Sequence, residues 1–168
     1  AKILAFEDDK DRIPMIDIPL KDNQVWKDGI FEFKVIHVPG HTSGHICFHF
    51  FNEKTVFTGD TLFSLGCGRI FEGSYEDMFN SLLRLKVLPP ETKVYFGHEY
   101  TLNNAIFCQR FDQNNSELNK KILNIKKKLD SGFPSVPSTI KDELNCNIFL
   151  RAKNQEEFSK LRDLKDNF

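Results

Sequence analysis

The stretch VPGHTSGHICFHF, from Val38 to Phe50, holds three of the chain's five histidines. His41 and His45 stand among Pro, Gly, Thr and Ser, residue types that form surface turns and often carry function. His49 falls in the run ICFHFF, which is typical of a strand. A glycine directly before His41 lets the backbone turn sharply, so an imidazole can point into a cavity. The stretch predicts either a polar turn or the rim of a metal site.

Two later loops repeat this arrangement, because each places a glycine before a metal-ligating residue after a strand-like run. Asp60 follows Gly59 in TGDTLF, and His98 follows Gly97 in GHEYT. Each motif alone is more often a turn or a satisfied surface residue, but three in succession are unlikely by chance. Imidazole and carboxylate donors suit zinc, iron or manganese. We therefore expect these loops to meet at one edge of a sheet and to form a metal site.

The remaining pattern predicts an α+β fold. Short runs rich in aromatic and β-branched residues predict strands over 2–6, 15–20, 31–38, 46–51, 55–60 and 93–97. Ser74 is a candidate N-cap, with Asp77 in the capping-box position, and Pro89-Pro90 ends the helix that follows. Apolar residues at helical spacing predict two further helices, one through residues 118–129 and one over about 155–165.

Composition narrows the functional classes. The hydrophobic share of 40%, the charged share of 28% and a net charge of -1 are ordinary for a globular protein and argue against nucleic acid or an anionic membrane as partner. The four cysteines form no C-x-x-C pair, which argues against a zinc ribbon and fits reduced thiols in the cytoplasm. No apolar run reaches transmembrane length and no signal-peptide pattern is present.

Three segments resemble the metallo-β-lactamase superfamily and, within it, glyoxalase II, the hydroxyacylglutathione hydrolases. They are PGHTSGHICF over 39–48, VFTGDTLFSLGCGRIFEG over 56–73, and VYFGHEYTLNNAIF over 94–107, and the likeness continues through VPSTIKDELNCNIFLR to the closing LRDLKDNF. The resemblance implies a metallo-β-lactamase-like αββα sandwich, N-terminally incomplete, over residues 1–110. It also implies a C-terminal helical, glutathione-binding domain over residues 111–168.

The resemblance assigns roles to the loop residues. His41 matches a ligand of a first metal ion, His98 matches a ligand of a second, and Asp60 matches the catalytic carboxylate that bridges both. The implied cofactor is a dinuclear zinc site, with iron or manganese as alternatives. His45 is interpreted as a structural hydrogen-bonding residue, and His49 carries no functional assignment.

The resemblance also implies substrate-binding positions. Arg69 matches a basic residue for a glutathione carboxylate, and Tyr100 matches a tyrosine beside the peptide moiety. Arg162 and Lys165, three apart on the predicted last helix, share one face and match basic residues at the mouth of the site. Phe71 departs from the family, which often has tyrosine there, so a hydroxyl donor to the ligand is lost.

The implied activity is hydrolysis of S-lactoylglutathione to D-lactate and glutathione by metal-activated water, with no side-chain nucleophile. The expected partner is the glutathione thioester, and a complete protein is expected to be a monomer. A lactonase or a persulfide dioxygenase with a single iron is the alternative within the superfamily. The C-terminal cations Arg162 and Lys165 argue against both.

One family motif, T-H-x-H-x-D-H, has no counterpart in this chain, whose first residues align just downstream of it. We therefore expect the chain to correspond to the C-terminal two-thirds of a glyoxalase II. A fragment, a split gene or a second chain would each explain this, and the alternative function is a catalytically impaired fragment that needs an N-terminal partner segment. Because zinc prefers at least three protein ligands, weak metal binding and little hydrolysis by this chain alone are expected.

Overall fold

The computed structural model describes all 168 residues, and its centre is a six-stranded mixed sheet. The strands lie in the order β10 (Ser138–Thr139), β9 (Lys93–Phe96), β6 (Thr55–Gly59), β5 (Ile46–Phe50), β4 (Phe31–His37) and β3 (Val25–Asp28). All neighbouring pairs are antiparallel except β6 and β9. A parallel pair needs a crossover connection, and this one contains α1 (Tyr75–Lys86).

Helix α1 covers one face of this sheet. It begins as predicted, because the Ser74 hydroxyl accepts a hydrogen bond from the Asp77 amide while the Asp77 carboxylate accepts one from the Ser74 amide. Its buried residues share a core with residues of the four central strands; this core includes Met78, Leu82, Leu85, Ile36, Cys47, Val56 and Val94. Buried residues alternate along β5 and β6, as the pleat requires, whereas β4 buries the adjacent residues Val35 and Ile36, one on each face of the sheet.

The opposite face carries a row of one aliphatic and three aromatic residues that crosses four strands. Val35 pairs with Phe48, Phe48 with Phe57, and Phe57 with Tyr95. A small parallel sheet of β1 (Leu4–Phe6) and β2 (Ile18–Leu20) packs over the β4 end of this row, where Leu20 shares a buried cluster with Phe33 and Val35. Phe57, at the other end, is 44% exposed. This face of the sheet is therefore covered at one end and open at the other.

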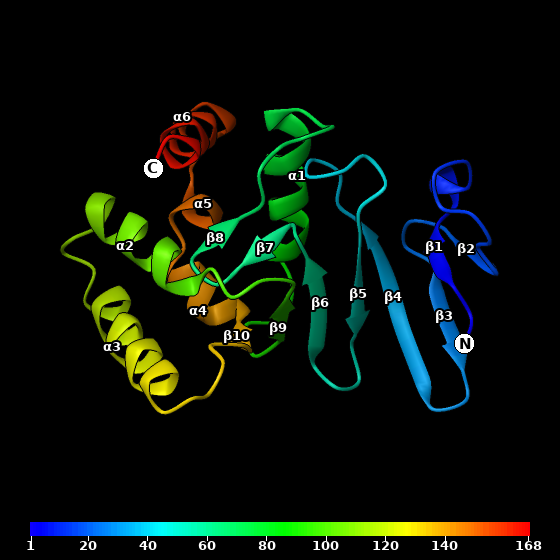
Figure 1. Ribbon diagram of the computed structural model, residues 1–168, viewed down its shortest axis with the longest axis horizontal. Coiled ribbons are helices and arrows are strands. Elements are labelled where there is room, and N and C mark those ends of the chain that lie inside the picture. The colour runs from blue at the N-terminus through cyan, green and yellow to red at the C-terminus, as the bar shows by residue number, and fades with distance from the viewer.

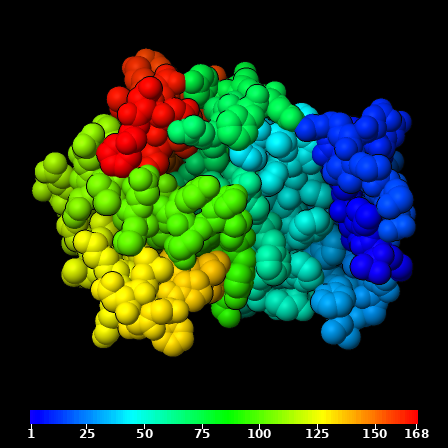
Figure 2. Space-filling view, viewed as in Figure 1, coloured from blue at the N-terminus to red at the C-terminus, as the bar shows by residue number.

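The helical residues gather beyond β9 and β10 and lie at the opposite end of the molecule from the N-terminus (Figure 1, Figure 2). They form α2 (Thr101–Phe111), α3 (Ser116–Asp130), α4 (Ile140–Cys146), α5 (Ile148–Arg151) and α6 (Gln155–Asp166). The short hairpin β7 (Leu62–Phe63) and β8 (Gly66–Cys67) connects β6 to α1, and η1 (Glu7–Asp9) follows β1. The predicted α+β class and the two predicted C-terminal helices are confirmed. The proposed domain boundary at residue 110 falls inside α2 and stays a prediction.

The structure shortens the predicted strands, most of all the one expected over 15–20, and adds elements that the pattern did not indicate. The strand expected over 15–20 is limited to β2, because Met15 is an exposed turn residue with a φ of 66°, which an extended strand does not allow. Strand β3 and helix α2 were not predicted. Strand β3 has only 4 residues. Helix α2 has 11 residues, but its apolar residues are not confined to one face, since Ile106 is 57% exposed and Phe107 is buried, so periodicity is a weak signal for it.

A buried carboxylate joins the β7–β8 hairpin to the helical part. Glu143 in α4 is 0% exposed and accepts hydrogen bonds from the Leu65 amide at 2.7 Å, from Asn147 Nδ2 at 3.0 Å and from the Ser138 hydroxyl. Lys121 Nζ lies 3.9 Å away. Burial raises the pKa of Glu143 above its usual value, although these partners oppose the shift. The hairpin is thereby fixed relative to α4.

Candidate metal centre and its cleft

The three predicted ligands meet at one edge of the six-stranded sheet. His41 comes from the loop between β4 and β5, Asp60 directly follows β6, and His98 follows β9. Asp60 lies between the two histidines: its Oδ2 is 3.5 Å from His41 Nε2, and its Oδ1 is 3.4 Å from His98 Nε2. Asp60 and His98, 38 positions apart in sequence, are adjacent here because β6 and β9 are parallel neighbours whose carboxyl ends coincide.

Two glycines make this close approach possible. A Cβ atom on Gly97 would lie 2.6 Å from Asp60 Oδ1, and a Cβ atom on Gly68 would lie 1.9 Å from the Asp60 carbonyl oxygen. Both separations are far shorter than real contacts of a Cβ atom, so any larger residue would displace Asp60. These glycines are needed for space and allow the backbone to approach the carboxylate.

A hydrogen bond on the side of the ring that faces away from Asp60 fixes the orientation of the His41 imidazole. Its Nδ1 donates a hydrogen bond of 2.9 Å to the Arg69 carbonyl oxygen, which leaves the Nε2 lone pair facing Asp60 in the neutral ring. The Phe71 amide in turn donates to the His41 carbonyl at 3.3 Å. A backbone carbonyl on the outer nitrogen is the usual arrangement for a histidine that binds a metal ion.

Aromatic side chains pack against the two histidine ligands. The His98 ring stacks on the Tyr100 ring at a centroid distance of 4.9 Å, and the Phe71 ring lies 5.0 Å from the His41 ring. The Asp60 amide donates to His45 Nε2 at 3.2 Å, in agreement with the structural role predicted for His45. Burial lowers the pKa of His45, which favours the neutral ring that can accept this bond.

The donor set fits a pair of metal ions. Asp60 Oδ1 is buried and has no hydrogen-bond partner, although such an atom is costly when it is left unpaired. Two ligand atoms on one tetrahedral zinc ion, each about 2.0–2.1 Å from it, are separated by about 3.3–3.4 Å. The separations of 3.4 and 3.5 Å at the two Asp60 oxygens are close to this value. Each oxygen of Asp60 faces one imidazole, and no three metal-ligating side chains converge on one point.

The ligands open onto a cleft of about 680 Å³ that reaches α6. Every substrate-binding residue expected from the sequence lines this cleft, together with the three predicted metal ligands; the former are Arg69, Phe71, Tyr100, Arg162 and Lys165. Phe71 is 68% exposed and Tyr100 is 52% exposed, so both present their rings to solvent at the cleft. The cleft therefore combines metal-ligating, aromatic and cationic groups.

The cations in the cleft are not equivalent. Arg162 is 3% exposed, and its Nη1 donates to the Cys67 carbonyl at 2.9 Å while its Nη2 donates to Asp166 Oδ1 at 2.8 Å. Lys165 donates to Asn103 Oδ1 and lies over the Phe168 ring. Burial, followed by the charge of Arg162, lowers the pKa of Lys165 to about 8. Arg69 is the exposed cation of this group.

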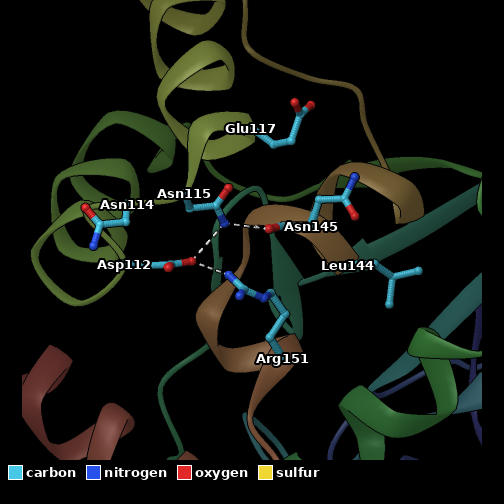
Figure 3. A pocket seen from close by; sticks show the side chains of 7 residues that line it. All are labelled: Asp112, Asn114, Asn115, Glu117, Leu144, Asn145 and Arg151. Atoms are coloured by element: carbon cyan, nitrogen blue, oxygen red, sulfur yellow. Dashed lines mark hydrogen bonds and ion pairs between the residues drawn. The ribbon is translucent and has the colours of Figure 1, made fainter.

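A second cleft of about 480 Å³ lies between the α2–α3 turn and helices α4 and α5 (Figure 3). Two of its charged side chains, Asp112 and Arg151, pair with each other, and Asn115 Nδ2 donates to both Asp112 and the Asn145 carbonyl. Asn115 also caps α3. The contacts in this cleft hold the α2–α3 turn against α4 and α5, and none of the predicted metal ligands lines it.

Comparisons with known proteins agree with this geometry. Residues 8–98 match the model of the metallo-β-lactamase superfamily, and residues 99–168 match the model described as the hydroxyacylglutathione hydrolase C-terminus. A hydroxyacylglutathione hydrolase of Pelagibacter ubique is 58% identical over the whole chain, and one of Rhizobium etli is 44% identical over 93% of it. The chain spans 70% and 66% of the length of these two relatives.

Among solved structures, the crystal structure of ETHE1 from Myxococcus xanthus matches 88% of this chain and 52% of its own, with a TM-score of 0.62 and 26% identity. The fold and the histidine–aspartate–histidine site define a protein of the metallo-β-lactamase superfamily, for which metal ions are implied. Within that superfamily, the chain belongs to the hydroxyacylglutathione hydrolase family, a family of thiolester hydrolases. No helix of the chain has the length and apolar character needed to cross a lipid bilayer.

Sequence reasoning missed residues that hold the site in place. Glu72 accepts hydrogen bonds from the Ser43 amide at 2.8 Å and from both terminal nitrogens of Arg12, so it ties the His41 loop to two other segments. Asp166 was also missed. Its position four residues after Arg162 is a sequence signal that could have identified it.

Proposed function

We propose that this protein hydrolyses glutathione thioesters, with S-lactoylglutathione as substrate and D-lactate and glutathione as products. The observation that carries the proposal is one cleft with two chemically distinct ends. One end holds His41, Asp60 and His98, and the other holds the cations Arg69 and Lys165. A thioester of glutathione has a reactive carbonyl and peptide carboxylates, which suit these two ends. The match of residues 99–168 to the hydrolase C-terminus supports this substrate class.

In this proposal His41, Asp60 and His98 would hold the metal ions. The nitrogen and oxygen donors suit zinc, with iron and manganese as alternatives. A bound pair of such ions lowers the pKa of water and polarises the thioester carbonyl.

The protein's own groups position these parts. The Arg69 carbonyl holds the His41 ring, and the Tyr100 ring supports His98 by stacking. The exposed rings of Phe71 and Tyr100 offer apolar contact to the acyl and peptide portions of the substrate and displace water from them. Arg69 and Lys165 attract the peptide carboxylates.

We further propose that another polypeptide segment or chain supplies additional metal ligands. Two imidazoles and one carboxylate, shared between two ions, fall below the three protein ligands that zinc usually takes in a catalytic site. The open part of the sheet, with Phe57 44% exposed beside Tyr95, is an apolar surface that such a segment could cover.

The four buried free cysteines support a reducing location such as the cytoplasm.

The test is residual hydrolysis of S-lactoylglutathione with added Zn²⁺, read as released thiol. Wild-type protein is expected to show a low rate that Asp60→Asn abolishes, because the shared ligand loses its charge. Asp28→Asn removes a carboxylate from an exposed ion pair with Lys2 and serves as the matched control. Equal rates for the wild type and Asp60→Asn would contradict the proposed reaction. Tight calorimetric binding of two zinc equivalents by the chain alone would contradict the need for additional ligands.

A further inference from the structure

Asp166, at the end of α6, occupies the cationic end of the cleft. Its Oδ1 lies 2.8 Å from Arg162 Nη2 and 3.4 Å from Arg69 Nε. Arg69 Nη2 also donates to the Asp166 backbone carbonyl at 3.4 Å. A single carboxylate oxygen of the protein therefore contacts two arginines that line the cleft, in the place where a ligand carboxylate would be expected to bind.

The position of Asp166 is unfavourable for helix stability. The carbonyl end of a helix carries a partial negative charge, which disfavours a carboxylate in the last turn. Two facts explain why Asp166 is accommodated. Arg162 is 3% exposed, so its charge needs a nearby anion, and Arg69 approaches from the loop after β8.

We propose that Asp166 is an internal carboxylate that competes with the carboxylate of a bound ligand for Arg69 and Arg162. This inference rests on the proposed glutathione site. The three cations at this end of the cleft are Arg69, Arg162 and Lys165. Together with Asp166 they carry a net charge of two rather than three, because the carboxylate balances one positive charge. The consequence is weaker binding of anionic ligands and faster release of glutathione after hydrolysis.

The opposite reading gives Asp166 a purely structural role as the partner of buried Arg162. In that case its removal would disorder Arg162 and weaken ligand binding. The two readings predict changes of opposite sign in the dissociation constant of an anionic ligand, and this constant can be measured without a metal ion.

The experiment is calorimetric titration of glutathione into wild-type protein and Asp166→Asn. The variant is expected to bind glutathione about threefold to tenfold more tightly, as removal of one competing charge near a partly exposed site implies. Glutathione diethyl ester, which lacks both carboxylates, is expected to bind wild type and variant equally. Glu156→Gln is the matched control: it lies on the same helix, breaks an exposed i,i+4 pair with Lys160 and makes the same change in charge. Its affinity for glutathione is expected to equal that of wild type.

An unchanged or larger dissociation constant for Asp166→Asn would overturn the inference and leave the proposed substrate intact. If neither wild type nor variant binds glutathione, the proposed substrate fails, and the inference fails with it. Asp166→Glu keeps the negative charge and provides a second test if the neutral variant Asp166→Asn does not fold. It is expected to bind glutathione within about twofold of wild type, and clearly tighter binding would also overturn competition by charge.

Discussion

The buried carboxylate of Glu143 gives the sharpest stability prediction. In Glu143→Ala, the Leu65 amide and the Ser138 hydroxyl both lose their acceptor inside the protein, whereas Asn147 Nδ2 keeps the Gly66 carbonyl at 3.0 Å. Each orphaned buried donor costs about 1–3 kcal/mol. The cavity left by the side chain adds about 1 kcal/mol or more. We therefore expect Glu143→Ala to lower the free energy of unfolding by about 3–5 kcal/mol.

Glu143→Gln separates the hydrogen bonds from the charge. The amide oxygen can still accept from Leu65, and the amide nitrogen can donate to the Ser138 hydroxyl, so the expected loss is below about 1 kcal/mol. The pKa of Glu143 is raised in the folded state. Stability from this group is therefore complete below its unfolded pKa and declines as pH rises through the folded pKa. The difference between wild type and Glu143→Gln should shrink as the pH rises above 4.5.

Urea unfolding followed by circular dichroism measures these differences. Glu117→Ala, an exposed change on α3, is the control and is expected to stay within about 0.5 kcal/mol of wild type. Equal losses for Glu143→Ala and Glu143→Gln would refute the reasoning, because the amide would then fail to replace the carboxylate as an acceptor for Leu65.

Two further predictions concern the cleft. Gly68→Ala should weaken zinc binding at least about tenfold in a calorimetric titration, because its Cβ would lie 1.9 Å from the Asp60 carbonyl and must displace that ligand; undiminished affinity would contradict this. Binding of S-methylglutathione should weaken as pH rises through about 8, the pKa to which burial and the charges of Arg162 and Arg69 lower Lys165. Below that pH the Lys165 amine is charged and attracts the ligand, so Lys165→Met should bind S-methylglutathione more weakly at pH 7 and should lose this pH dependence. The same fall in affinity near pH 8 in Lys165→Met would contradict the role of Lys165.

Much of the fold could be predicted from the sequence because its signals are local. The capping box at Ser74 and the helical spacing of Leu118 and Ile122 both act within a few residues, and both correspond to helices in the structure. The Gly-His and Gly-Asp motifs likewise pointed to His41, Asp60 and His98, since a glycine next to a ligand is visible in the sequence itself.

Only the tertiary structure decided how these groups face one another. That each oxygen of Asp60 meets a different imidazole depends on the register of β6 against β9. That Glu143 is buried, and that Asp166 contacts Arg69, depends on packing between segments 78 and 97 positions apart. The physical reason is that burial and charge pairing are properties of distance in space, whereas helix caps and glycine turns are properties of neighbours along the chain.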